Sequence, residues 1–447
     1  MVRSAVVRTL LSVPVLVACD DARTDPVPLE SDFAANGEQL LAGSLDGDAW
    51  AARFAGTDRP VWQSILDTGG TEAAYGVTEL TDGLILLGGE VDGDAWVVLL
   101  SSEGQVQWEQ RFGEAGARSR ATAVGEGVSR DLIVVGSRTG ATGADSGAFV
   151  FRLDRSGVLL SQRVFSGVEF VPRRVLPREI DDGIYLIGRS GPSAWAAAVS
   201  AAGQLEWSVN VNGLAGAAIT DGVAQPGELW LTGTTVGIGS PTDLFFARLN
   251  RGGEALLASV VQTVGEERSP QFGAFESEAN DGLANIVLTT DSFGTQAPGD
   301  QDLWWLTVST TGELDTKALH GSRDQEAVVR VRGNEDDGLQ VVGAVRRIAD
   351  TNEGVADASI QDASDGGDAA VIPSPPTQTG TVVTWNIVGG AVEGCGRPLT
   401  EGTAIPFSLA IVTNALDTAE ADGAFSIAPT ESTLRRRSGT STFLCNP

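Results

Sequence analysis

The chain has 447 residues, of which 42% are hydrophobic and 56 are glycine, a composition that suits many short strands and tight turns rather than long helices. Its 30 Lys and Arg residues against 59 Asp and Glu residues give a formal net charge of -29. Because phosphate backbones are bound by clustered cations, this balance argues against nucleic acid as a partner and indicates a solvated acidic surface.

The first 18 residues have the pattern of a signal peptide. Arg3 and Arg8 precede an apolar core that runs from about Leu10 to Val17. Such a core is too short to span a bilayer as a stable helix, but it fits the hydrophobic region of an export signal. We therefore expect residues 1–18 to be removed and the remainder to lie outside the cytoplasm.

The end of this core, Leu16-Val17-Ala18-Cys19, resembles the lipobox of bacterial lipoproteins. That resemblance implies a diacylglycerol on Cys19, cleavage just before it and acylation of the new amino terminus. The alternative is an ordinary signal peptide in which Cys19 is incidental. On the first interpretation the chain is anchored to a membrane of the bacterial cell envelope, inner or outer, and the acidic, proline-containing residues 19–35 are a lipidated tether.

A repeated unit begins at Asn36. Each copy has an apolar run, usually ending in glycine, then a loop, an aromatic strand, a turn and a further strand. Successive aromatics lie 46 to 59 residues apart, and a degenerate seventh copy is expected at Ala370; the aromatics are Trp50, Trp96, Phe149, Trp195, Phe245 and Trp304. The further strand carries a tryptophan in several copies, namely Trp62, Trp108, Trp207 and Trp385.

A period near fifty residues fits four strands and their turns, which is the length of one β-propeller blade. We therefore predict an all-β fold, a seven-bladed β-propeller of four-stranded antiparallel blades over residues 36–390. The pattern resembles secreted bacterial propeller repeats, and Leu86-Leu87-Gly88-Gly89 resembles the double-glycine strand of kelch repeats. This resemblance implies a fold and no particular function, because propellers host enzymes, binders and scaffolds alike.

The ends of the repeat region raise two further expectations. Because the unit begins in the middle of a blade and nothing suitable precedes Asn36, we expect Ile405–Val412 to supply the missing strand and close the ring. Residues 349–380 are rich in Asp, Ala, Ser and Pro. They are either an insertion within the seventh blade or a linker to a separate domain.

The C-terminal segment, residues 391–447, holds Cys395 and Cys445, the cysteines that remain once Cys19 is acylated. In an exported protein one leftover pair most simply forms a disulfide, so we expect a short, disulfide-stapled extension. Arg435-Arg436-Arg437 is interpreted as a solvated cluster, with docking to an acidic partner as the alternative.

The sequence argues against histidine-dependent catalysis, because His320, in a polar turn, is the single histidine. It also contains no phosphate-binding motif and no nucleophile-elbow motif. Carboxylates recur instead just ahead of the aromatic, at Asp46, Asp48, Asp92, Asp94, Asp300 and Asp302, with Asp243 alone in its copy. Recurrence at one place favours aspartates that accept backbone N–H bonds at a turn. Calcium binding is the alternative for these six residues, and no other cofactor is expected.

The functional hypothesis is a lipid-anchored monomer that binds a protein, a glycan or an envelope component and performs no chemistry of its own, with loops on one face as the recognition surface. The alternative is a carboxylate-dependent glycan hydrolase or lyase in the central funnel. The two differ in one observable respect. Asp48, Asp94 and Asp302 should approach backbone amides in the first case and converge in one cleft in the second.

Overall fold

The structure is a computed structural model that describes residues 30–45, 47–55, 59–114, 116–140, 146–166, 170–212, 216–236, 242–261, 266–275, 283–290, 302–320, 325–333, 339–346, 380–388, 391–392, 405–406, 410–413, 426–429 and 433–436. In these ranges the regular secondary structure is entirely β-strand. No helix that could cross a membrane occurs in this part of the chain. The predicted all-β class is confirmed.

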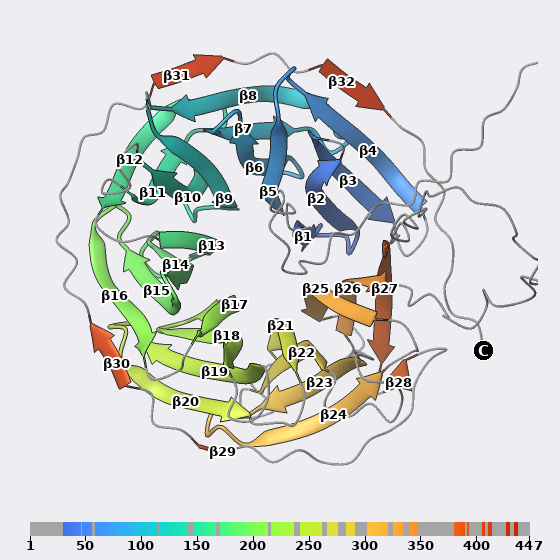
Figure 1. The fold of residues 1–447 in the computed structure, drawn as a ribbon, viewed down its shortest axis with the longest axis vertical. Helices are drawn as coiled ribbons and strands as arrows, with labels where there is room; N and C mark the ends of the chain where they lie inside the picture. The colour runs from blue at the N-terminus through green and yellow to red at the C-terminus, as the bar shows by residue number, and fades with distance from the viewer. Residues whose placement is uncertain are drawn as a thin grey trace, which may run out of the picture.

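The described strands form seven antiparallel sheets, which stand around a ring as a β-propeller (Figure 1). We number the sheets in chain order. Sheets 1 to 3 hold β1 (Glu30–Phe33), β2 (Gln39–Leu45), β3 (Asp48–Ala55) and β4 (Arg59–Asp67); β5 (Glu72–Glu79), β6 (Ile85–Val91), β7 (Asp94–Leu100) and β8 (Val106–Gly113); and β9 (Arg118–Glu126), β10 (Leu132–Thr139), β11 (Gly147–Leu153) and β12 (Leu159–Ser166).

Sheets 4 to 7, like sheets 1 to 3, have their first four strands in chain order from the ring axis outward. They hold β13 (Phe170–Pro177), β14 (Ile184–Ser190), β15 (Ser193–Val199) and β16 (Leu205–Asn212); β17 (Ala218–Gln225), β18 (Glu228–Val236), β19 (Thr242–Asn250) and β20 (Ala255–Val261); β21 (Glu267–Phe275), β22 (Ala284–Thr290), β23 (Asp302–Val308) and β24 (Leu314–His320); and β25 (Gln325–Gly333), β26 (Leu339–Arg346), β27 (Gly380–Val388) and β28 (Ala391–Val392).

The repeated glycine lies where the innermost strand bulges toward the second strand. Gly136 on β10 pairs with the aromatic Phe149, and the register of β9 against β10 shifts at this point. A Cβ at Gly136 would lie 2.0 Å from the carbonyl oxygen of Arg120. A Cβ at Gly233, in the equivalent place, would lie 2.0 Å from the carbonyl oxygen of Ala218. Only glycine fits so close to a neighbouring backbone, which explains why the apolar runs end in it.

The aromatic strand packs between sheets, as the period-two pattern predicts. Trp96 on β7 and Phe149 on β11 are fully buried. Phe112 of sheet 2 meets Phe151 of sheet 3 with ring centroids 4.9 Å apart. Neighbouring sheets therefore share one apolar layer, and no single sheet buries its own faces.

The tryptophan of the outer strand contacts the next sheet. The indole N–H of Trp108 donates to the carbonyl oxygen of Arg155 at 2.9 Å, and its ring covers Gly157 in the β11–β12 turn. Trp207 makes the same contact with Arg251, at 2.7 Å. The tryptophan of one sheet and the turn glycine of the next therefore form a contact that recurs between successive blades, as Trp207 also covers Gly253.

Two strand assignments differ from the sequence prediction. The innermost strand of sheet 1 is β1, which precedes Asn36, so the first blade is complete without any C-terminal residue. In sheet 7, Val383 of β27 pairs with Gly343, the place that an aromatic takes in other sheets. Ala370, predicted for that place, lies outside the described residues. Trp385 is on the third strand rather than the fourth, because a short alternating pattern does not reveal which strand of a blade it forms.

The C-terminal residues form four short strands on the outer edges of the sheets, and we call these the belt. They are β29 (Ile405–Pro406), β30 (Ala410–Thr413), β31 (Ser426–Pro429) and β32 (Thr433–Arg436), paired with β20, β16, β8 and β4 respectively. The belt follows the periphery of the ring in the direction opposite to the chain order of the sheets (Figure 1). The expectation that Ile405–Val412 closes the ring is therefore wrong: these residues add outer strands to sheets 5 and 4.

The acidic segment 349–380 connects β26 to β27. These two strands pair along their whole length, with Arg346 opposite Gly380. The segment therefore connects two neighbouring strands of one sheet. His320, expected in a turn, is the last residue of β24 and pairs with Leu303.

Candidate functional site

A cavity with a volume of about 890 Å³ lies on the ring axis. Its walls come from the innermost strands of sheets 1, 4, 5, 6 and 7 and from the β13–β14 and β17–β18 turns. The ionisable residues that line it are Asp32, Arg174, Arg178, Glu179, Asp181, Asp221, Arg251, Arg330 and Arg332. Propeller strands meet at the axis, so side chains distant in sequence gather there.

Asp221 on β17 is the most enclosed charged group of the cavity, with 1% of the residue exposed. Its carboxylate accepts backbone N–H bonds from Gly222 at 2.8 Å and from Phe272 at 2.9 Å. Arg174 approaches it to 3.0 Å. Burial nevertheless raises the pKa of Asp221 above its ordinary value, because the desolvation of the charged form outweighs Arg174 and the two N–H donors.

Arg330 on β25 connects two carboxylates across the axis. One of its terminal nitrogens lies 3.5 Å from Asp221 and the other 3.6 Å from Asp32 on β1. Asp32 also accepts a hydrogen bond from the hydroxyl of Thr78 at 2.7 Å. Sheets 1, 2, 4, 5, 6 and 7 are therefore joined at the axis by one network of charged and polar groups, centred on two aspartates.

A second set of ion pairs surrounds the mouth of the cavity. Arg178 donates to Asp181 at 2.8 and 2.9 Å and to Glu206 at 2.5 Å, and it lies over the ring of Tyr185 at 5.4 Å. Arg251 pairs with Asp181 at 2.5 Å. Burial would raise the pKa of Asp181, but the N–H of Gly183 and the two guanidinium groups lower it. The charges at this mouth largely neutralise one another.

The predicted acids do not converge on this cavity. Asp48, Asp94 and Asp302 begin the third strands of sheets 1, 2 and 6. Asp94 lies against Gly113, and Asp302 is buried. None of the three lines the axial cavity. Asp46 and Asp300 lie outside the described residues, so the repeated aspartates form no common cleft within the part that is described.

Asp92 has the role of a turn former that its recurrence predicts. Together with Gly93 it forms the two-residue loop between the paired residues Val91 and Asp94, and both loop residues have positive φ, 53° and 93°. This is the type I′ hairpin turn that Asp-Gly favours. The Asp92 carboxylate accepts the backbone N–H of Thr71 at 3.1 Å.

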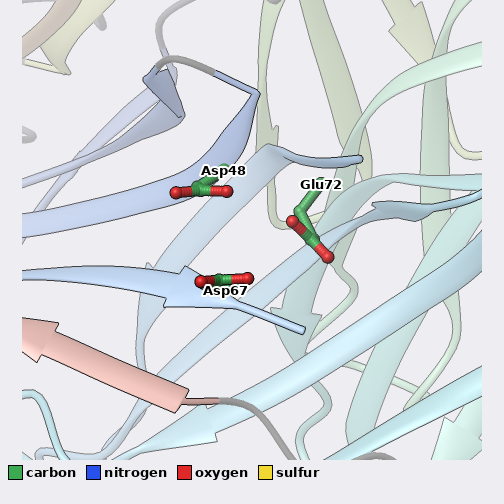
Figure 2. A group of neighbouring side chains, drawn as sticks. All are labelled: Asp48, Asp67 and Glu72. Atoms are coloured by element: carbon green, nitrogen blue, oxygen red, sulfur yellow. The ribbon is translucent and has the colours of Figure 1, made fainter. Parts of the chain in front are cut away.

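Asp48 instead meets two acids that the sequence analysis did not single out. These are Asp67 at the end of β4 and Glu72 at the start of β5. Carboxylate oxygens of the three residues lie within 4.8 Å of one another (Figure 2). Glu72 is fully buried, and one of its oxygens accepts bonds from Gly70 and Thr68. Hard cations prefer such oxygens, but exposed acidic groups commonly gather without one, and no cofactor is indicated.

Cys19, Cys395 and Cys445 lie outside the described residues. The residues of the axial network were not predicted, because they lie on the innermost strands and not on the strand with the strong aromatic pattern. The innermost strands offer a weaker signal, a pair of arginines at Arg173-Arg174 and alternating arginines at Arg330 and Arg332. Alternating charges in a strand that must face the axis indicate a polar channel.

No protein-family model and no curated protein matches this chain. Among solved structures, the chain is similar to the Dos1 propeller, with a TM-score of 0.42 and 10% identity over 69% of this chain and 87% of that one. Drosophila Semaphorin 1b, extracellular domains 1-2, gives 0.37 and 6% over 70% and 78%. Drosophila Plexin A in complex with Semaphorin 1b gives 0.36 and 8% over 53% of this chain, which spans only 51% of the plexin chain.

Proposed function

We propose that this protein is a lipid-anchored lipoprotein of the bacterial cell envelope, a seven-bladed propeller that binds a protein, a glycan or another envelope component outside the cytoplasm. The observation that carries the binding function is the axial cavity of about 890 Å³ within a ring of sheets. A concave site with a few fixed polar groups on a rigid scaffold is the usual form of a ligand site. The lipobox resemblance at Leu16–Cys19 supports the anchor.

The alternative of a glycan hydrolase requires two carboxylates that flank one bond. The acids predicted for that role, Asp48, Asp94 and Asp302, lie on sheets 1, 2 and 6 respectively. Of the four acids that line the cavity, Asp32 and Asp221 pair with Arg330 and Arg174, and Asp181 pairs with Arg178 and Arg251. These contacts favour a binding role for the cavity.

The course of the belt supports the predicted disulfide. Cys395 follows β28 of sheet 7 by three residues, and Cys445 follows β32 of sheet 1 by nine. Sheets 7 and 1 are neighbours in the ring (Figure 1). A bond between these cysteines would therefore join the chain that follows the last belt strand to the chain that follows β28, and the extension would be stapled as the sequence predicts.

Membrane anchoring is tested by growing cells that express the full-length protein or the Cys19→Ser variant with radiolabelled palmitate. We expect label and membrane sedimentation for the unchanged protein only, because acyl chains contribute about 0.8 kcal/mol per buried CH₂ and two or more give a stable anchor. Equal labelling of both proteins, or a soluble unchanged protein, would refute the lipoprotein assignment. The same material incubated with envelope polysaccharides should release no reducing ends; release would favour the hydrolase.

A further inference from the structure

A second, smaller cavity opens on the axis between the innermost strands of sheets 2 to 5. It has a volume of about 190 Å³. Three arginines and several apolar or aromatic groups line it, and we call it the arginine recess; its principal residues are Tyr75, Arg120, Pro172, Arg173, Arg189 and Ile219. Within the described part of the chain, no carboxylate lines the recess.

One of the three arginines, Arg120, is oriented by contacts within the protein. Glu90 is 7% exposed and pairs with Arg120 at 3.4 Å and with Arg118 at 2.7 Å. The guanidinium of Arg120 also lies over the ring of Tyr75, 5.5 Å from its centroid. These two contacts orient Arg120 before any ligand arrives, so less conformational entropy is lost on binding.

The other two arginines project from adjacent strands of sheet 4. Arg189 on β14 is directly opposite Val171 on β13, and Arg173 lies at the bulge of β13 between Pro172 and Arg174. Both side chains are exposed. Neither side chain has a hydrogen bond or an ion pair with a residue that the structure describes, although the charge of Arg173 acts on Asp221 and opposes the rise of its pKa.

The recess thus differs in charge from the rest of the molecule. The whole chain carries -29, and the larger axial cavity balances its five arginines with four carboxylates. Arg120 has Glu90 as a partner, but Arg173 and Arg189 have no direct partner among the described residues, so the positive charges here are only partly balanced and an anion would relieve their repulsion. Arginine is also the residue whose fork of N–H donors matches a carboxylate or a phosphate.

We propose that the arginine recess binds the oxyanion of a small ligand, a carboxylate or a phosphate on a molecule or chain end of about monosaccharide size. Arg173 and Arg189 donate to the oxyanion, Arg120 contributes its fixed charge, and Tyr75, Pro172 and Ile219 contact the apolar face of the ligand. The size follows from the volume of the recess, which is below the roughly 300 Å³ at which sites for drug-sized ligands begin. This inference deepens the proposed binding function but does not depend on the lipid anchor.

The test uses three probes with one sugar framework: glucuronate, glucose 6-phosphate and uncharged glucose. Binding to the full-length protein in a non-ionic detergent is measured by calorimetry. We expect at least one anionic sugar to bind and glucose not to bind, with an affinity that falls as NaCl rises from about 50 mM to about 500 mM. The anion that binds identifies the oxyanion as a carboxylate or a phosphate.

Arg173→Gln/Arg189→Gln should lower the affinity at least about tenfold, because two charge-assisted donors are lost. Arg130→Gln removes another exposed arginine, in the β9–β10 turn, and should change nothing. Thermal melts of the variants establish that they are folded. No binding of either anion at about 10 mM, equal binding of glucose, or unchanged affinity in the double variant would overturn the oxyanion site. None of these results depends on whether Cys19 carries lipid.

Discussion

Asp221 shows how a single carboxylate at the axis couples the stability of the ring to pH. It is almost completely enclosed, and burial raises its pKa above the ordinary value of 3.8 despite Arg174 and two backbone donors. The folded state therefore holds the proton more tightly than the unfolded chain does. The contribution of this group to stability is fully present below 3.8 and is lost as the pH rises through the folded-state pKa.

Replacement of Asp221 by Asn should remove this dependence. The melting temperature of Asp221→Asn minus that of the unchanged protein should increase between about pH 3 and about pH 7. The reason is that only the unchanged protein has a carboxyl group here that loses its proton over this range. The measurement is a set of thermal melts of the full-length protein at fixed ionic strength. A relative melting temperature that stays constant or decreases would contradict the assignment.

Asp154 supplies an opposite control for this experiment. Its carboxylate, in the exposed β11–β12 turn, accepts hydrogen bonds from Ser156 and Val158, and these lower its pKa below 3.8. Its contribution is present above that value and is lost as the pH falls. Asp154→Asn should therefore become less stable, relative to the unchanged protein, as the pH rises over the same range.

The tryptophan contacts between successive sheets explain why the outer strand carries a recognisable sequence pattern. Each indole covers a turn glycine of the next sheet and donates its N–H to a turn carbonyl, as Trp108 does to Gly157 and Arg155. In sheet 3 the place of the tryptophan is taken by Ser161, and Arg163 covers Gly203 instead. A side chain of similar reach can thus replace the indole, and the repeat tolerates variation.

Truncation of Trp108 should loosen one of these contacts. We expect Trp108→Ala to lower the free energy of unfolding by about 3 kcal/mol, since a large, half-buried ring and its hydrogen bond are lost. Trp108→Phe keeps a ring over Gly157 and should cost only about 1 kcal/mol, the contribution of the N–H bond. Urea unfolding of the full-length protein measures both. If the two variants were equally stable, the ring would not be the main part of the contact.

The sequence predicted those elements whose residues have a strong local reason to recur. Aromatics buried between sheets, glycines at the bulge and Asp-Gly turns are each required by local geometry, and all were recognisable, as at Phe149, Gly136 and Asp92-Gly93. The innermost strand β1 was missed, because its four residues lie within the predicted tether 19–35 and carry too little periodicity. Trp385 was assigned to the wrong strand of its blade for the same reason.

At the scale of the whole molecule, the sequence did not predict how distant segments combine. The ion pairs of Arg330 with Asp32 and Asp221 join residues separated by 298 and 109 positions, and no local pattern indicates such a contact. The pairing of the belt strands was predicted wrongly for a related reason. Ile405 and Ala410–Thr413 do form strands, but the partners of a short strand are decided by which sheet edges are free.

The belt gives the last prediction, because it covers the outer edges of four sheets. An unpaired edge strand presents free N–H and C=O groups that can pair with another molecule. The strands β29 to β32 pair with these groups on β20, β16, β8 and β4. Deletion of residues 405–447 should therefore lower the melting temperature and cause association that increases with protein concentration.

Light scattering across a concentration series measures this association. The control is deletion of residues 437–447, which removes Cys445 and leaves all four belt strands in place. It should remain monomeric, whatever the loss of a disulfide costs in stability. If both truncated proteins were monomeric at every concentration, the outer edges would need no cover. Association of the longer deletion alone would show that the belt protects the ring by occupying its edges, because the two proteins share every residue of the seven sheets except the belt strands.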